Sequence, residues 1–309
     1  MPETLTFGPP IITADIEDWP QSTWDHSLPI SSRAADNTRR LLDILARSGV
    51  RATLFVLAKF AQAFPDLVRQ MDAAGHEVAA HTWAHEEVFR KTPQQFLENA
   101  RRTKDLLEQL TGKPVLGYRA ADFSIIRDTL WGLDVLAEAG YAYDSSIFPV
   151  ERPRYGIPDW PQSPHRAKLS SGRTIVEFPI ASYTAWGRNW PVGGGGYHRL
   201  LPGWASRALA RRVMRSAPFV FYCHPYEFDP REFAEIPHQI PWKVRFHQGL
   251  GRSRFEARFV AFLKAFSGRR MVDALDERAW PDLDTESIAR GTRGANSQSA
   301  LAATIHKDH

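Results

Sequence analysis

Residues 75–85, GHEVAAHTWAH, form a short apolar run that ends in two histidines four residues apart. If the chain turns helical at His81, this separation places the imidazoles of His81 and His85 on one face, about one helical turn apart. Neutral imidazoles are common ligands of zinc and related ions, and a catalytic site needs only one further protein ligand and an open position. The stretch therefore predicts a buried strand that delivers two metal ligands. The alternative is chance placement of two of the eleven histidines on a solvated turn.

Strands and helices alternate on both sides of this stretch. Apolar runs predict strands over residues 11–16, 52–57, 115–119, 174–180 and 219–224. Amphipathic patterns and helix-capping residues predict helices over 34–48, 60–74, 92–110, 128–138, 202–215 and 255–266, with a possible final element over 271–275. Such alternation predicts parallel strands joined by right-handed crossovers, and hence an α/β sheet or barrel. In these folds the chemistry lies at the carboxyl ends of the strands.

Three acids close together follow the first predicted strand. Asp15, Glu17 and Asp18 lie within four residues of one another at its carboxyl end. Clustered carboxylates repel one another unless a proton or a cation neutralises them, so the cluster indicates a raised pKa or a metal. A capped loop start with solvated acids is the alternative. Two further strands end in Arg119 and His224, so one sheet edge would gather acids, histidines and an arginine.

Composition indicates a folded enzyme-sized chain and excludes several classes. The chain has 309 residues, 43% hydrophobic and 24% charged, which is normal for a globular protein with a sizeable core. A net charge of +4, spread along the chain, does not indicate nucleic-acid binding. The single cysteine, Cys223, excludes an internal disulfide. We expect one domain over residues 1–280, a disordered tail over 281–309, no transmembrane segment and no secretory signal.

Two irregular regions carry many aromatic residues. Residues 141–170 predict a long loop that wraps over a site. Residues 187–197 contain four consecutive glycines, which predict a flexible or tightly folded flap rather than a phosphate loop. Sugar rings could stack on aromatic loop residues in and between these regions, such as Trp160, Tyr183, Trp186 and Trp190.

Five short motifs, in order over residues 11–275, resemble those of the polysaccharide deacetylases of carbohydrate esterase family four, the nodulation-deacetylase homology domain. The motifs are Asp15-Ile16-Glu17-Asp18, His81 to His85, Gly117-Tyr118-Arg119-Ala120, Tyr143-Asp144-Ser145-Ser146 and Phe221-Tyr222-Cys223-His224-Pro225. The glycine-rich stretch, residues 190–201, looks like that of the subfamily found at exosortase (PEP-CTERM) exopolysaccharide loci.

The resemblance implies a distorted (β/α) barrel of about seven strands with a metal-dependent N-deacetylase site. It implies one divalent metal ion, zinc first and cobalt or manganese as alternatives, held by His81, His85 and an acid of the first motif. The neighbouring acid would be the general base, held by Arg119. Asp144 would belong to the shell around the site, and His224 would protonate the leaving amine.

The first and third motifs depart from the family pattern. The family has two adjacent aspartates and a glycine where this chain has Asp-Ile-Glu-Asp-Trp, so two registers are open. Asp15 is the base with Asp18 or Glu17 as the metal ligand, or Glu17 is the base with Asp18 as the ligand. We favour Asp15 as base and Asp18 as ligand, because the strand would place Asp15 deepest. Asp122 replaces a small hydroxyl residue and could contact substrate, with a solvated turn as its alternative.

The leading hypothesis is hydrolysis of N-acetyl groups from amino sugars of an exopolysaccharide or its precursor. An N-acetylated carbohydrate would be the substrate, with Asp122, Trp190 and Tyr197 as binding residues. One alternative is a hydrolase of small amides or cyclic imides on the same fold, and another is a metal-free carbohydrate-binding barrel. The expected location is cytoplasmic, near the inner membrane face if the polymer is exported. The sequence leaves the oligomeric state open.

Overall fold

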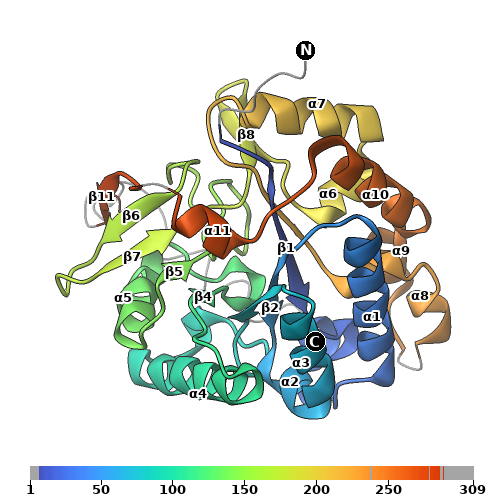
Figure 1. Ribbon diagram of the computed structural model, residues 1–309, viewed down its shortest axis with the longest axis horizontal. Coiled ribbons are helices and arrows are strands. Elements are labelled where there is room, and N and C mark those ends of the chain that lie inside the picture. Colours follow the sequence, from blue (N-terminus) through green and yellow to red (C-terminus); the bar gives the residue numbers. More distant parts are fainter. Residues whose placement is uncertain (1–6, 237–238, 278, 286–287, 289–309) are drawn as a thin grey trace.

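The computed structural model describes residues 7–236, 239–277, 279–285 and 288, and is built around one sheet of nine strands (Figure 1). Seven neighbouring strands run parallel: β10 (Val220–Cys223), β1 (Ile11–Ile16), β2 (Thr53–Val56), β3 (Glu77–Ala80), β4 (Gly117–Tyr118), β5 (Tyr143–Asp144) and β7 (Thr174–Glu177). Then come β6 (His165–Lys168), antiparallel to β7, and β11 (Asp282–Asp284), parallel to β6. The predicted α/β class with a parallel central sheet is confirmed.

Helices lie around the parallel strands, so the strands are buried (Figure 1). All six residues of β1 are buried, as expected for a continuous apolar run in a parallel sheet. The larger helices are α1 (Ser32–Arg47), α2 (Ala58–Ala63), α3 (Pro65–Ala73), α4 (Pro93–Thr111), α5 (Trp131–Glu138), α7 (Gly203–Val213) and α10 (Phe255–Phe266). Shorter elements follow in the second half: the hairpin of β8 (Ser182–Ala185) and β9 (Arg188–Pro191), α6 (Gly195–Leu200), α8 (Glu232–Glu235), α9 (Trp242–Gly249) and α11 (Met271–Leu275). None of the helices in the described part of the chain has the length and apolar character needed to span a membrane.

Two elements of the structure have bounds that differ from those predicted from the sequence. The helix predicted over 60–74 is two helices, α2 and α3, because Phe64 has a φ of −134° before Pro65, and the residue before a proline disfavours the helical region. The tail predicted to be disordered from residue 281 begins with an ordered strand, β11, which pairs with β6. The rest of that predicted tail, apart from Thr285 and Ile288, lies outside the described residues.

The gap between β7 and β10 is spanned by single backbone hydrogen bonds and not by a continuous ladder. The N–H of Ala181 donates to the carbonyl of Val220 at 3.2 Å, and the N–H of Gly193 donates to the carbonyl of Ala181 at 2.9 Å. Tyr222 in turn donates its N–H to the carbonyl of Gly193 at 2.8 Å. The glycine run therefore begins as backbone packed against β10, which supports the tightly folded alternative for this segment.

Gly193 and Gly196 allow a paired test of this packing. A Cβ at Gly193 would lie 2.3 Å from the carbonyl oxygen of Val220, whereas a Cβ at Gly196 would meet no atom within 4 Å. We expect Gly193→Ala to lower the free energy of unfolding by about 1–3 kcal/mol, because backbone must shift. Gly196→Ala is expected to be neutral or stabilising by up to about 1 kcal/mol, because alanine favours a helix. Urea denaturation measures both, and equal effects would contradict the packing.

Candidate metal centre

His81 and His85 follow β3 at its carboxyl end, but on a turn and not on a helix. Thr82 and His85 have φ values of 57° and 63°, so the helical turn expected at His81 does not form. The hydroxyl of Thr82 accepts the N–H of His85 at 3.0 Å and holds the turn closed. The two imidazole centroids nevertheless lie 5.2 Å apart. The two imidazole rings are therefore close together, as predicted, but a turn with left-handed backbone at Thr82 and His85 brings them there.

Glu17 completes a buried group with these two histidines. Its Oε2 lies 3.3 Å from Nε2 of His81 and 2.8 Å from Nε2 of His85, and all three side chains are at most 6% exposed. One ligand atom from each of the three residues falls within 4.8 Å of the others. Two imidazoles and a carboxylate are a donor set found in catalytic divalent-metal sites, with a position left open.

The hydrogen bonding of His81 supports a cation in this group. Nδ1 of His81 lies 2.9 Å from the carbonyl oxygen of Arg119, which can only accept, so Nδ1 carries the proton of the neutral ring. The lone pair of Nε2 then faces the Glu17 carboxylate, an arrangement that is repulsive unless a cation lies between them. Burial raises the pKa of Glu17, but the nearby charge of His85, the largest opposing effect, holds the pKa well below its usual range. An ionised carboxylate beside imidazole nitrogens fits a divalent metal.

Asp15 lies beside Arg119, as the resemblance implied. Nη1 of Arg119 donates to Oδ1 of Asp15 at 2.7 Å and to the hydroxyl of Thr13 at 2.8 Å. Nε and Nη2 of Arg119 donate to the carbonyl and the hydroxyl of Ser145 at 3.1 and 2.9 Å. The guanidinium is fully buried, so it holds the Asp15 carboxylate in one orientation. Sequence reasoning missed the roles of Thr13 and Ser145; the position of Ser145 in the fourth motif was the only available signal.

Asp18, which we favoured as the metal ligand, serves a different purpose. Its two carboxylate oxygens accept the N–H of Ser31 at 2.7 Å and the hydroxyl of Ser31 at 3.0 Å. Ser31 is the N-cap of α1, so Asp18 anchors the start of that helix. Glu17 and Asp18 follow the end of β1 at Ile16, and Glu17 has its carboxylate beside the histidines. The structure therefore replaces Asp18 by Glu17 as the acid beside the histidines, the other option of the same register.

His224 directly follows β10 and approaches both Asp15 and Glu17. Its Nε2 is 3.9 Å from Oδ2 of Asp15 and 3.7 Å from Oε1 of Glu17. The ring stacks on Tyr226 with centroids 4.7 Å apart, and its side chain is 20% exposed. Burial lowers the pKa of His224, but the nearby carboxylates of Glu227 and Glu17 outweigh it, so the pKa is raised. The group can carry a proton beside the acids.

Asp144 lies deeper, below Arg119. It is fully buried and accepts the hydroxyl of Ser146 at 2.6 Å and the N–H of Ser146 at 2.9 Å. Burial raises the pKa of Asp144, and hydrogen bonds to Glu177 and Ser146 only partly offset this effect. The hydroxyl of Ser146 in turn accepts the N–H of Ala120, the residue after Arg119, at 2.7 Å. The predicted place of Asp144 in the shell around the site stays a prediction.

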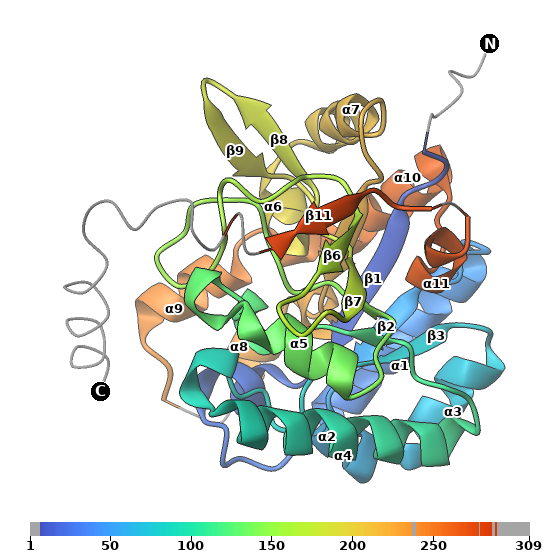
Figure 2. The ribbon, with the colours of Figure 1, turned by 90° about the vertical axis from the view of Figure 1, so that its left-hand side faces the viewer.

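The predicted substrate-binding residues lie on other segments. Asp122 is 43% exposed and accepts a hydrogen bond from Arg154 at 2.9 Å. The hydroxyl of Tyr197 accepts from Arg152 at 3.1 Å. Trp190 is 46% exposed on β9, in a hairpin that projects from the body of the molecule (Figure 2). Trp160 is only 2% exposed and belongs to the core, so it is not available to stack on a sugar.

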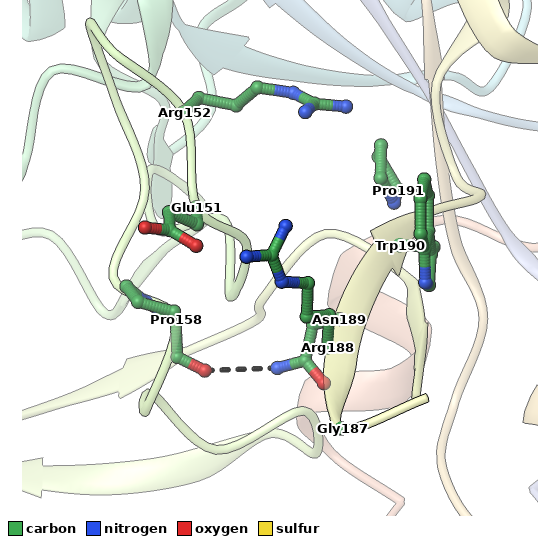
Figure 3. A pocket seen from close by; sticks show the side chains of 8 residues that line it. All are labelled: Glu151, Arg152, Pro158, Gly187, Arg188, Asn189, Trp190 and Pro191. Atoms are coloured by element: carbon green, nitrogen blue, oxygen red, sulfur yellow. Dashed lines mark hydrogen bonds between the residues drawn. The ribbon is translucent and has the colours of Figure 1, made fainter. Parts of the chain in front are cut away.

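A small pocket lies between this hairpin and the loop before β6 (Figure 3). Its volume is about 180 Å³, and its lining includes Arg152, Arg188, Asn189 and Trp190. The amide of Asn189 donates to the carbonyl of Pro158 at 2.9 Å, which joins the hairpin to the loop. The pocket combines an indole face with polar groups, which suits a sugar ring.

Comparison with known proteins gives two consecutive matches. Residues 21–143 match the family model described as polysaccharide deacetylase, and residues 145–276 match a domain of unknown function, DUF3473. The nine-stranded sheet contains strands from both matched segments, since β5 pairs with β7.

Among curated proteins, two relatives carry deacetylase names. The peptidoglycan deacetylase-like protein FGM2 of Gibberella zeae is 34% identical over 110 residues, which are 35% of this chain and 32% of the relative. The chitooligosaccharide deacetylase of a Bradyrhizobium strain is 29% identical over 123 residues, 40% of this chain and 52% of the relative. The chain therefore matches about a third to a half of the length of these two relatives.

A solved structure resembles the fold over most of its length. The crystal structure of a probable polysaccharide deacetylase from Pseudomonas aeruginosa covers 91% of this chain and 89% of its own, with a TM-score of 0.53 and 16% identity. At that identity the likeness concerns the fold alone.

Proposed function

We propose that this protein hydrolyses N-acetyl groups of amino sugars in a metal-dependent reaction. Membership of the polysaccharide deacetylase family, the premise of this proposal, is supported by the match to the family model and by the relatives with deacetylase names. The observation that carries the proposal is the buried group of Glu17, His81 and His85, with Asp15 and His224 beside it. This set contains metal ligands, a base and an acid, the parts required for amide hydrolysis.

Each residue has a role that follows from its position. Glu17, His81 and His85 would hold one divalent ion, with zinc proposed first and cobalt or manganese as alternatives. Such an ion polarises a carbonyl group and lowers the pKa of water. Asp15 would be the general base: Arg119 holds its Oδ1, and its Oδ2 lies 3.9 Å from Nε2 of His224. His224 donates a proton to the leaving amine.

The aromatic hairpin supports a carbohydrate substrate. Trp186 is 91% exposed, and its ring meets that of Trp190 edge to face at 6.3 Å. Exposed indoles beside the pocket of Figure 3 would stack on sugar rings of an extended chain.

We propose that the substrate is an exopolysaccharide or its precursor, and that the nearest group of relatives is the exosortase-locus subfamily. We further propose that both matched segments form a single catalytic domain and that the protein acts in the cytoplasm. The metal-free binding barrel is disfavoured, because such a protein has no need of a complete donor set.

Chelation and metal restoration test the proposal. The purified protein is treated with a chelator, and acetate release is measured from defined N-acetyl-hexosamine oligomers before and after addition of zinc, cobalt or manganese. We expect chelation to abolish release and one equivalent of a divalent ion to restore it, because the ion supplies the carbonyl polarisation. Release that survives complete chelation would overturn metal dependence. Turnover of small amides with inert oligomers would favour the small-amide alternative.

A further inference from the structure

The carboxylate of Glu227 lies behind His224, on the side away from the acids. Glu227 is 3% exposed and follows His224 by one short turn, Pro225–Phe228. Its Oε2 accepts the backbone N–H of His224 at 3.2 Å and lies 3.7 Å from Nδ1 of the same imidazole. Since Nε2 of that ring faces Asp15 and Glu17, the two ring nitrogens face carboxylates on opposite sides.

The surroundings of Glu227 keep its carboxylate in this position. A Cβ at Gly195 would lie 2.1 Å from Oε2 of Glu227, so only glycine leaves room for the carboxylate there. On the other side, Nε of Arg199 lies 3.5 Å from Oε1. Burial raises the pKa of Glu227, but the charges of His224 and Arg199 and the backbone N–H of His224 outweigh it, so the pKa is lowered.

We propose that Glu227 is a positioning residue for His224: its carboxylate, 3.7 Å from Nδ1, attracts Nδ1–H of the imidazole and so directs Nε2–H toward the nitrogen of the scissile amide. This inference rests on the proposed deacetylase function. As the C–N bond breaks, its electron pair stays on nitrogen, which takes the Nε2 proton of His224. The carboxylate that orients the acid thus comes from the turn Pro225–Phe228, directly after β10.

A purely structural role for Glu227 makes a different prediction. An acid that only caps the turn would affect folding stability, and its loss would reduce all activities of the site alike. A positioning role acts only where the leaving group needs a proton. An amine must be protonated as it leaves, whereas 4-nitrophenolate leaves without a proton, so substrates of these two kinds separate the roles.

The test is Glu227→Gln, which preserves shape and an oxygen that can accept the N–H of His224. With N-acetyl-hexosamine oligomers we expect kcat to fall about 10- to 100-fold with KM and bound metal unchanged, a part of the about 10²- to 10⁴-fold that a positioned proton donor contributes. With 4-nitrophenyl acetate the variant should stay within about twofold of the wild type. In a His224→Gln background, Glu227→Gln should cause no further loss on the oligomers, because its effect passes through the imidazole.

The matched control is Glu77→Gln. Glu77 begins β3, at the opposite end of that strand from the metal centre, and its Oε2 accepts a backbone N–H from Val272 at 3.0 Å. We expect this variant to keep wild-type kcat on both substrates. An unchanged kcat for Glu227→Gln, an equal loss on both substrates, or losses that multiply with His224→Gln would overturn the positioning role. A wild-type protein that releases no acetate from any oligomer would instead overturn the proposed function.

Discussion

Replacing either His81 or His85 by alanine is expected to remove the bound divalent ion and to lower acetate release by about 1000-fold or more. Each histidine supplies one of three donors in a site closed by Glu17, and two donors seldom hold a catalytic ion. Loss of the ion removes several kcal/mol of transition-state stabilisation, and about 1.4 kcal/mol corresponds to a factor of ten in rate. Metal content by mass spectrometry and acetate release measured on the same preparation test both parts.

A histidine outside the site provides the control for this experiment. His247 is exposed on α9, and His247→Ala is expected to retain metal and rate. Acetate release that persists in both His81→Ala and His85→Ala would contradict a mechanism that depends on the bound metal ion. Loss of metal with full retention of rate would show that the ion is structural.

The three acids of the first motif are expected to give three different phenotypes. Asp15→Asn should keep the metal and lose about 10²- to 10⁴-fold in kcat, because it removes only the base. Glu17→Gln should bind metal weakly, because a neutral amide replaces the anionic donor beside His81 and His85. Asp18→Asn should keep metal and most of the rate, but lower the free energy of unfolding by about 1–3 kcal/mol, because Ser31 loses charged acceptors at the start of α1.

Metal titration, kcat and urea denaturation of the three variants decide between the registers. Metal loss in Asp18→Asn together with metal retention in Glu17→Gln would restore Asp18 as the metal ligand that we favoured from sequence. A rate unchanged in Asp15→Asn would remove Asp15 as the base and leave Glu17 for that role.

Much of the fold could be predicted because its elements depend on local pattern. Continuous apolar runs identified buried strands such as β1, and Thr92 with Gln95 forms the capping box that starts α4, with Gly112 in the left-handed region after its end. The local sequence pattern did not predict the backbone conformation of the turn that carries the two histidines. The turn between His81 and His85 uses left-handed residues, and no propensity for threonine or histidine indicates such a conformation.

The sequence by itself determined which side chains could meet, because parallel strands bring their carboxyl ends to one edge and the histidines, acids, Arg119 and His224 all lie at such ends. Only the tertiary structure decided how they divide the chemistry. Arg119 reaches Asp15 across 104 residues of sequence, Glu17 takes the place beside the histidines, and Asp18 is drawn to Ser31. These assignments depend on distances of a few ångströms between distant segments, and no spacing along the chain encodes such distances.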